Sequence, residues 1–358
     1  MEKIVQGLAE HLVARGHRCD VVTLNRSFED GSAYTPYDLH NGVNVYRIPF
    51  RGSTRYPIAP KVARFAANYD LIHVHGVDFL VDWLVLNKAR HQKPIVLSTH
   101  GGFFHTEFAQ NFKKAWFQTM TRLTLRGVDR VLASSEHDQG LFEEVSDRVA
   151  LARNAVDLSV YKNLKNTPTP GRWVCVGRVD VHKGIGALLH TLAEFRKRDD
   201  RPFEMRIIGP EVVGGLLDKL RSERDRLGLN GLVFFDGRIE FEALHQAVAS
   251  AELAIFPSEY EAFGISVVEA MGAGALTVLN DIEPFRDFVE EKGCGFVAPF
   301  SEPERAAEVL STALSISKAK RKTMTRDARN KALEYDWTAT VSRFEELYRD
   351  VLEGKNGS

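Results

Sequence analysis

The sequence predicts an α/β protein made of two doubly wound, Rossmann-like domains that face each other across a cleft. Short apolar runs, rich in β-branched and aliphatic residues, alternate with amphipathic stretches along the chain. Strands that alternate with helices form parallel sheets covered on both faces. A chain of 358 residues is also longer than one hydrophobic core ordinarily supports, which favours two domains.

The first domain is expected over residues 1–162. It opens with an amphipathic helix that ends at Gly16, and a second helical pattern lies near residues 83–89. Its predicted strands are 21–24, 71–74, 95–98 and 131–133.

A linker is expected at residues 163–171, because two prolines and a glycine there interrupt the apolar period. The alternation restarts in a second domain, expected over residues 172–335. Ligands of doubly wound sheets bind beyond the carboxyl ends of the strands, so we expect the chemistry in the loops after them. The predicted strands of this domain are 173–176, 205–208, 232–235, 253–256 and 276–279.

The composition is that of a soluble globular chain, with 44% hydrophobic and 27% charged residues. The net charge of -1 argues against a protein whose whole surface binds nucleic acid. Cys19, Cys175 and Cys294 are isolated, which argues against a disulfide framework and suits a reducing cytosol. We expect no transmembrane helix, because no apolar run reaches about 18 residues.

The strongest motif runs from Ser258 to Gly274. A buried strand ends just before it, and a helix begins near Gly264, where unpaired backbone N–H groups suit a phosphate. Glu261 and Glu269 are eight residues apart in this motif. In one interpretation, one carboxylate meets a sugar and the other accepts hydrogen bonds from ribose hydroxyls. In the other, Glu261 is solvated and Glu269 caps a neighbouring group.

A second motif, from Gly177 to Gly184, follows the strand at 173–176. Arg178 and Lys183 are two cations five residues apart in one loop and can bracket a diphosphate. The alternative is a solvated loop in which Lys183 caps a turn. Gly184-Ile185-Gly186 lacks the third glycine of a dinucleotide fingerprint, which disfavours an NAD site.

A third motif places His100 before two glycines at the end of the strand at 95–98, where it is either reachable from the cleft or a packing residue. A metal site at His100, His105 and Glu107 is not expected, because their spacing matches no familiar ligand pattern. His73 and His75 lie at the end of the preceding strand, so we expect them in the core or in support of a site.

The helix expected over residues 108–126 carries an apolar stripe and four basic residues. Such a helix either lies on an anionic membrane surface or packs into the core with its lysines solvated. The stripe is formed by Phe112, Trp116, Phe117, Met120 and Leu123, and the basic residues are Lys113, Lys114, Arg122 and Arg126.

With these residues in place, the chain resembles the retaining glycosyltransferases of family 4, which have the GT-B fold. The likeness covers nearly the whole chain, and the motif from Glu261 to Glu269 is its most specific part. Residues 98–106 and 121–125 look like the α-mannosyltransferases that use GDP-mannose to extend cellobiose on a polyprenyl diphosphate in exopolysaccharide assembly. The other supporting segments are 14–23, 154–157, 177–184 and 235–238.

The resemblance implies a role for each matching position. Arg178 and Lys183, beside Gly177, would hold the donor diphosphate and stabilise it as it leaves, which is electrostatic catalysis. His100 would face the donor sugar from the other domain as the cleft closes. The remaining donor-binding positions would be Glu269 at the ribose, Gly237 and Arg238 at the nucleobase, and Glu261, Phe263, Gly264 and Ile265 at the hexose and α-phosphate.

The family is metal-independent, and the chain contains no Asp-x-Asp, so these cations would replace a metal. The helix at 337–352, within the terminal segment 336–358, would return to pack on the first domain. The chain departs from the family pattern in two ways. Ala155 stands where glycine is usual, and the strand and Gly-Gly loop that precede the first helix are missing. We therefore expect a truncated or misassigned start, with low activity that upstream residues restore.

The expected function is transfer of a hexose, mannose from GDP-mannose, to a polyprenyl-diphosphate-linked oligosaccharide with retention at the anomeric carbon. The nucleotide sugar would be a substrate, and no cofactor or nucleic acid would take part. The protein would be cytoplasmic and peripheral on the membrane, through the helix at 108–126. The alternatives are a family 4 transferase that uses a UDP-sugar on another acceptor, or a nucleotide-sugar-binding protein without catalysis.

Overall fold

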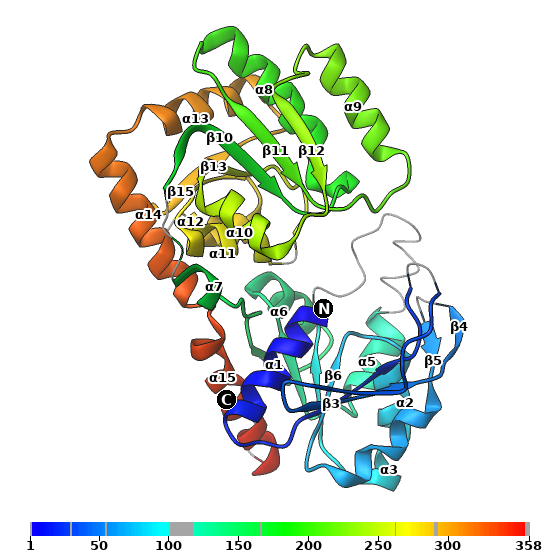
Figure 1. Cartoon of the computed structure of the whole chain (residues 1–358). Helices are drawn as coiled ribbons and strands as arrows, with labels where there is room; N and C mark the ends of the chain where they lie inside the picture. Colours follow the sequence, from blue (N-terminus) through cyan, green and yellow to red (C-terminus); the bar gives the residue numbers. More distant parts are fainter. Residues whose placement is uncertain are drawn as a thin grey trace. The chain divides into compact units, whose positions relative to one another are not determined.

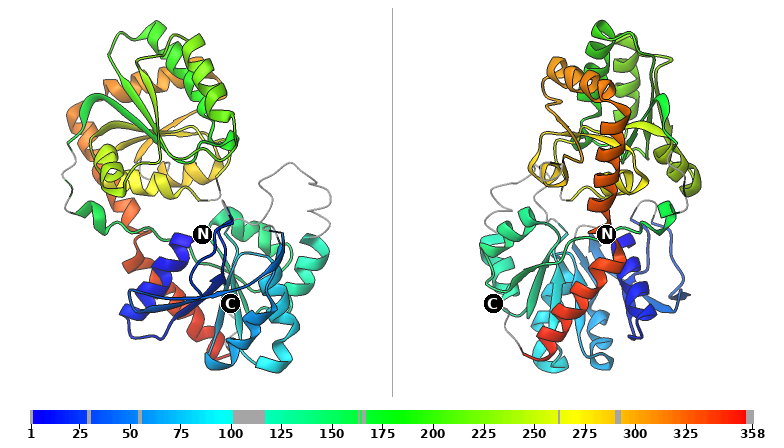
Figure 2. Two further views of the ribbon diagram at one scale, coloured as in Figure 1. Left: turned by 45° about the vertical axis from the view of Figure 1, so that its right-hand side comes forward. Right: turned by 90° about the vertical axis from the view of Figure 1, so that its left-hand side faces the viewer.

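A computed structural model describes residues 2–28, 31–53, 56–100, 117–162, 164, 167–261, 263–289 and 293–354. The chain divides into two compact units. Unit 1 contains Met1–Ala155 and Trp337–Ser358, and unit 2 contains Val156–Asp336 (Figures 1 and 2).

Unit 2 begins before the segment that the sequence marks as a linker. Val156 forms a parallel bridge with Asp336, and the amide of Leu158 donates to an Asp336 carboxylate oxygen at 3.3 Å. The side chain of Leu158 also lies against Gly272, in the interior of unit 2. These contacts attach the residues after 155 to the second unit.

Unit 1 contains two separate sheets with three or more strands among its described residues. One is the parallel sheet β6-β7-β8-β9, and the other has the order β1-β3-β2, in which β1 and β3 are parallel. This differs from one continuous doubly wound sheet, because β1 and β6 belong to different sheets. The elements of the unit are α1 (Glu2–Ala14), β1 (Asp20–Leu24), β2 (Tyr37–His40), β3 (Val43–Ile48), β4 (Arg51–Ser53), β5 (Tyr56–Ile58), η1 (Pro60–Arg64), η2 (Ala66–Asn68), β6 (Ile72–His75), α2 (Phe79–Leu86), α3 (Lys88–His91), β7 (Ile95–Ser98), η3 (Phe117–Thr121), α5 (Arg122–Leu125), β8 (Arg130–Ala133), α6 (Glu136–Glu143), β9 (Val149–Leu151) and α15 (Trp337–Leu352).

The last helix of the chain, α15, packs against the first, α1, inside unit 1 (Figures 1 and 2). The rings of Trp337 and His11 stack with their centroids 5.3 Å apart. Just beyond the other end of α1, His17 contacts Glu345 at 2.9 Å. The apolar face of each helix is thus buried by a segment more than 300 residues away in the chain.

The described residues of unit 2 form one parallel sheet of six strands in the order β12-β11-β10-β13-β14-β15. Strand β10 is first in the chain but central in the sheet. The strand order therefore reverses between β10 and β13, which is where doubly wound folds bind ligands. The elements are α7 (Ser159–Lys162), β10 (Thr169–Val176), η4 (Val181–Lys183), α8 (Ile185–Arg198), β11 (Glu204–Ile208), α9 (Leu216–Arg226), β12 (Val233–Gly237), α10 (Phe241–Ala249), β13 (Ala251–Phe256), α11 (Ile265–Ala273), β14 (Leu276–Asn280), α12 (Glu283–Val289), β15 (Gly295–Ala298), α13 (Pro303–Ser315) and α14 (Lys318–Leu333).

The two faces of this sheet are covered by different helices, because successive side chains of a strand point to opposite faces. Trp173 and Cys175 of β10 belong to the apolar cluster that includes α8 and α13. Val174, between them, belongs to the cluster that includes α11, α12 and α14. Both faces are therefore buried, which explains the continuous apolar runs of these strands.

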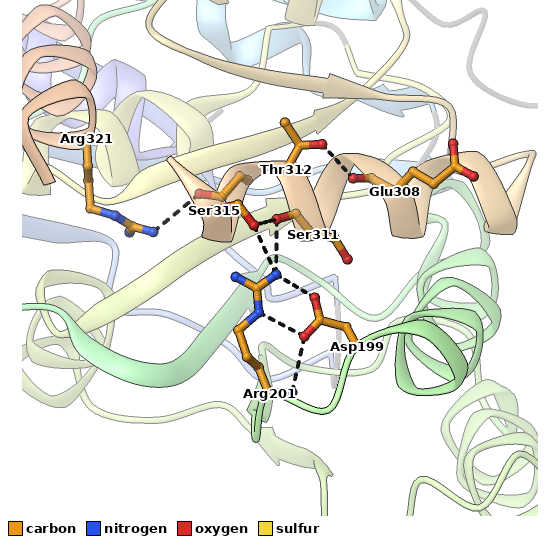
Figure 3. Close-up of polar contacts among 8 residues, drawn as sticks. Asp199, Arg201, Glu308, Ser311, Thr312, Ser315 and Arg321 are labelled. Carbon is orange, nitrogen blue, oxygen red and sulfur yellow. Dashed lines mark hydrogen bonds and ion pairs between the residues drawn. The ribbon is translucent and has the colours of Figure 1, made fainter. Parts of the chain in front are cut away.

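A polar cluster fixes the loop after α8 to the end of α13 (Figure 3). Arg201 donates to the Asp199 carboxylate through two nitrogens, with the Nε–Oδ1 distance at 2.8 Å. It also donates to the backbone oxygen of Ser311 at 3.1 Å and to the hydroxyl of Ser315 at 3.3 Å. The hydrogen bonds from Arg201 lower the pKa of Asp199 to about 2.

Candidate active site

Two loops of unit 2 meet at the carboxyl edge of its sheet. One follows β10 and contains Arg178 and Lys183, and the other follows β13 and contains Glu261. Since β10 and β13 are neighbouring parallel strands, their carboxyl ends lie side by side at the reversal of strand order. The topology thus brings together two motifs that are 78 residues apart in the sequence.

The charged centre of this edge is an ion pair between Lys183 Nζ and Glu261 Oε1. Both side chains are mostly buried, with 23% of Lys183 and 18% of Glu261 exposed. The hydroxyl of Ser258 donates to the same Glu261 oxygen at 3.0 Å. Arg178, which is exposed, lies at the start of the same loop as Lys183. The edge therefore offers one held cation and one solvent-facing cation to an anionic ligand.

The backbone clamps the two loops together. The amide of Glu259 donates to the backbone oxygen of His182 at 2.9 Å. Gly184 has a φ of +63°, and a Cβ atom built there would lie 2.1 Å from the backbone oxygen of Pro257. Glycine is thus the residue that permits this approach.

At the carboxyl ends of β10, β11 and β12, the backbones of Gly177, Gly209 and Gly237 lie in close contact. A Cβ atom on Gly209 would lie 1.9 Å from the backbone oxygen of Gly177. The amide of Gly209 donates to the backbone oxygen of Gly237 at 2.8 Å. The carbons of the Lys183 side chain lie over Gly177, 3.7 Å from the position of a Cβ atom. Gly237 has a φ of +66°, and Arg238, just after it, is exposed at the same edge.

Helix α11 begins at this edge behind Gly264. No described side chain caps its N-terminus, and Gly264 has a φ of +100° with the ring of Phe285 against it. Phe263 points into the core, where its ring meets those of Phe288 and Tyr335. The backbone N–H groups of Phe263, Gly264 and Ile265 are thus the part of this segment that can meet a phosphate.

Glu269 lies about one turn inside α11 and is partly buried. Its negative charge adds to the effect of burial in raising the pKa of Tyr161, a buried residue of α7. The helix thus carries a carboxylate close to a phenol in unit 2. The two carboxylates of the motif therefore stand in different surroundings, which the eight-residue spacing alone did not determine.

His100 belongs to unit 1, directly after Thr99 at the end of β7. Its Nε2 atom lies 2.8 Å from Nδ1 of His75. Burial lowers the pKa of His100 to about 4. His105 and Glu107, which the sequence placed near it, lie outside the described residues. Within the described part of the chain, no three His, Cys, Asp or Glu residues gather as a metal site would require.

The described part of the helix expected at 108–126 begins at Phe117, as a π turn followed by α5. The predicted apolar stripe divides here, because Phe117 is buried against Phe142 while Met120 and Leu123 are 49% and 59% exposed. The basic residues Arg122 and Arg126 are exposed. Phe112, Lys113, Lys114 and Trp116 lie outside the described residues. No helix among the described ones is long and apolar enough to cross a membrane.

Three residues of the edge had no assigned role in the sequence. Ser258 holds Glu261, and His182 bonds the second loop. Asn280, at the end of β14, donates to the backbone oxygen of Ser258 at 3.0 Å and accepts from the amide of Phe300 at 3.1 Å. The sequence could have indicated Asn280, because it directly follows the predicted strand at 276–279, and the loops after strands form this edge.

The fold matches that of known two-domain enzymes. Sucrose-phosphate synthase from Thermosynechococcus elongatus superposes with a TM-score of 0.79 at 19% identity, over 98% of this chain and 93% of that one. The chain has two α/β units, and one of them carries two cations at the sheet edge where the strand order reverses. Together with the structural likeness, this defines a GT-B fold.

The family follows from the sequence comparisons. Residues 1–160 match the model of Glycosyltransferase Family 4, and residues 162–331 match that of Glycosyl transferases group 1. The chain is 37% identical to the GDP-mannose:cellobiosyl-diphosphopolyprenol alpha-mannosyltransferase of Xanthomonas oryzae pv. oryzae, over 98% of this chain and 93% of that protein. The protein of the same name from Xanthomonas campestris is 35% identical, over 98% and 93%. The chain therefore belongs to the family 4 glycosyltransferases and is a hexosyltransferase.

Proposed function

We propose that the protein transfers mannose from GDP-mannose to cellobiose on a polyprenyl diphosphate, with retention at the anomeric carbon. The observation that carries this proposal is the pair of cations, Arg178 and Lys183, at the sheet edge where no described side chain caps the start of α11. The donor and acceptor are those in the names of the relatives that are 35–37% identical over nearly the whole chain.

The chemistry requires the bond between mannose C1 and the diphosphate oxygen to break as the acceptor hydroxyl oxygen bonds to C1 from the same face, and the hydroxyl proton passes to the departing diphosphate. Negative charge then grows on the departing diphosphate. Lys183, released from Glu261, and Arg178 would neutralise that charge, and the N–H groups at the start of α11 would add their dipole. Fixed cations in a partly buried site stabilise such charge more strongly than water does.

The remaining donor contacts are assigned by position. Glu269 would accept hydrogen bonds from the ribose hydroxyls, and Glu261 would turn to the hexose. Gly237 and Arg238 would meet the nucleobase, and His100 of unit 1 would contact the hexose.

The protein would be peripheral on the cytoplasmic membrane face. The exposed side chains of Met120 and Leu123 would insert among anionic lipids, and those of Arg122 and Arg126 would contact the headgroups. Apolar and basic side chains on one short segment support this part of the proposal.

The test is a donor panel with synthetic cellobiosyl-diphosphopolyprenol as the acceptor. We expect mannosyl transfer from GDP-mannose and not from UDP-glucose, UDP-galactose or UDP-N-acetylglucosamine. Transfer from a UDP-sugar would instead support the second family 4 assignment. If GDP raises the melting temperature but no donor turns over, the protein is a nucleotide-sugar-binding protein.

The cation pair is tested with Lys183→Ala and a matched surface variant of the same unit, Lys197→Ala. Lys197 lies on α8 and pairs with Glu194 at the surface, with 67% of its side chain exposed. We expect Lys197→Ala to transfer mannose at the wild-type rate. Equal rates in both variants would refute the proposed role of the cations.

A further inference from the structure

A row of side-chain contacts extends from His100 to His75 and His73 in unit 1. His75 ends β6, and His100 follows β7, the neighbouring parallel strand. The parallel register pairs His75 with Ser98, two residues before His100. The planes of the two imidazole rings are nearly parallel, at an interplanar angle of 21°, and the ring centroids are 5.1 Å apart. Nδ1 of His75 and Nε2 of His100 are 2.8 Å apart, which is hydrogen-bond distance.

The backbone at His100 makes this ring contact specific. His100 has a φ of +50°, in the left-handed region that residues other than glycine rarely adopt. Such a conformation persists only where surrounding contacts hold it. The contact to the His100 ring comes from His75, at the end of the neighbouring strand β6.

His75 is itself held from behind. Its ring lies 4.1 Å from that of His73, centroid to centroid. His73 contacts the hydroxyl of Ser98 at 2.8 Å through Nε2 and that of Tyr348 at 2.6 Å through Nδ1. A row of side chains thus links the C-terminal helix α15 to the ring of His100.

The contact between the two imidazoles couples their tautomers. Burial lowers the pKa of His75 well below its usual value and that of His73 to about 3, so these rings are neutral at neutral pH. A neutral imidazole carries one N–H and one bare nitrogen. The 2.8 Å contact can hold a single proton, so one ring donates and the other accepts. The tautomer of His75 therefore determines which nitrogen of His100 carries its proton.

We propose that His75 is a positioning residue that sets the tautomer and the ring plane of His100 for hexosyl transfer. The inference rests on the proposed function, in which His100 contacts the donor hexose. With Nε2 engaged by His75, the Nδ1 atom is the one left to meet a sugar hydroxyl. Its donor or acceptor character is then coupled to the tautomer of His75 before the substrate binds, which lowers the cost of ordering the site.

The direct test observes the tautomer of His100 by long-range ¹H–¹⁵N NMR of ¹⁵N-histidine-labelled full-length protein. We expect a single neutral tautomer in the wild type and the same one in His75→Asn, whose amide occupies the position of Nδ1. His75→Leu cannot bond Nε2, and we expect a mixture of both tautomers. An unchanged single tautomer in a folded His75→Leu variant would overturn the proposal.

Activity supplies the second measurement. We expect His75→Leu to lower kcat by about tenfold to hundredfold, the loss typical when a metal-ligating histidine loses its orienting partner. The KM for GDP-mannose should change by less than about threefold in that variant, and His75→Asn should recover most of the rate. If His75→Leu and His75→Asn lower kcat equally while both keep the wild-type tautomer, His75 has only a structural role.

Two controls separate this inference from the proposed function. His91 is another partly buried histidine of unit 1, bonded through Nε2 to the backbone oxygen of Leu84 at 2.9 Å. We expect His91→Asn to leave kcat and the His100 spectrum unchanged. Full activity of His100→Ala would refute the role of His100 in the proposed function, whereas the tautomer measurement would still report on His75.

Discussion

Lys183 and Glu261 form an ion pair in unit 2, although one follows β10 and the other follows β13. In the absence of a donor, each charge neutralises the other, and Ser258 holds the carboxylate in place. In the proposed function, the donor diphosphate would replace Glu261 as the partner of Lys183. The ion pair would then hold the cation in position until the donor binds.

The first prediction concerns this pair. Lys183→Ala should lower kcat/KM for mannosyl transfer by about a hundredfold or more, the usual loss when a donor to a developing oxyanion is removed. Lys183→Arg should retain part of the rate, because it keeps the positive charge but not the compact ammonium group. Steady-state kinetics with GDP-mannose measures both. A loss in Lys183→Ala confined to a raised KM would show that the cation contributes only uniform binding.

The second prediction concerns Glu269 and the ribose. Glu269→Ala should nearly abolish transfer, and Glu269→Gln should weaken GDP binding by about tenfold, since an amide is a poorer acceptor for the two hydroxyls. Calorimetry with GDP and with 2′,3′-dideoxy-GDP isolates the contact. The wild type should discriminate between the two nucleotides, while Glu269→Gln should bind both alike. Equal discrimination by both proteins would place the ribose elsewhere.

The third prediction concerns the close approach of the two loops at Gly184. Gly184→Ala should lower the free energy of unfolding of unit 2 by about 1–3 kcal/mol, because the φ is positive and the Cβ would press on backbone atoms of Pro257. Gly186 is the matched control, since it lies in α8 with no atom within 4 Å of its Cβ position. Gly186→Ala should raise stability by about 0.5–1 kcal/mol. Urea unfolding followed by hydrogen exchange in unit 2 distinguishes the two.

Five of the six strands described in the second unit, β10 to β14, were predicted, because both faces of the sheet are buried there, whereas β15 was not predicted. Continuous apolar runs are unmistakable when neither face is solvated, and the runs at 205–208, 253–256 and 276–279 all lie in strands. Exposed strands such as β2, whose four residues are all exposed, carry no such signal and were missed. Strand β10 starts at Thr169, inside the expected linker. This start was missed because the first residues of the strand are mostly exposed and carry no apolar signal.

The site was predictable only in part, for a related reason. Loops that follow strands can be located from sequence, which placed Arg178, Lys183 and Glu261 after two such strands. Which side chains touch depends on strand order, and the sequence does not reveal that β10 and β13 are neighbours. The contact between His75 and His100 likewise follows from the parallel register of β6 and β7.

The fourth prediction uses the carboxylate of Asp199. Its folded pKa of about 2 lies below the unfolded value of about 3.9, so it stabilises the fold above about pH 4 and loses that contribution as the pH falls toward about 2. The Arg201 side chain is 40% exposed, so solvent screening limits the contribution to about 1 kcal/mol. Arg201→Ala should therefore lower stability at neutral pH and flatten its decline between about pH 4 and pH 2. Arg305→Ala removes an exposed ion pair with Glu302 and is the control. In acid-unfolding curves it should change neither the stability at neutral pH nor its decline in acid.

The fifth prediction tests the packing of α15 on α1. A Cβ atom on Gly7 would lie 2.5 Å from the indole ring of Trp337, which is buried and stacked on His11. Gly7→Ala should displace that rigid ring and destabilise unit 1 by about 1–3 kcal/mol, with faster hydrogen exchange in both helices. Gly140→Ala, in α6 with no atom near its Cβ position, should slow exchange or leave it unchanged.

Because the clash is with one side chain, the double variant Gly7→Ala with Trp337→Leu should lose less stability than the sum of the single changes. Strict additivity would mean that the two residues do not touch in solution.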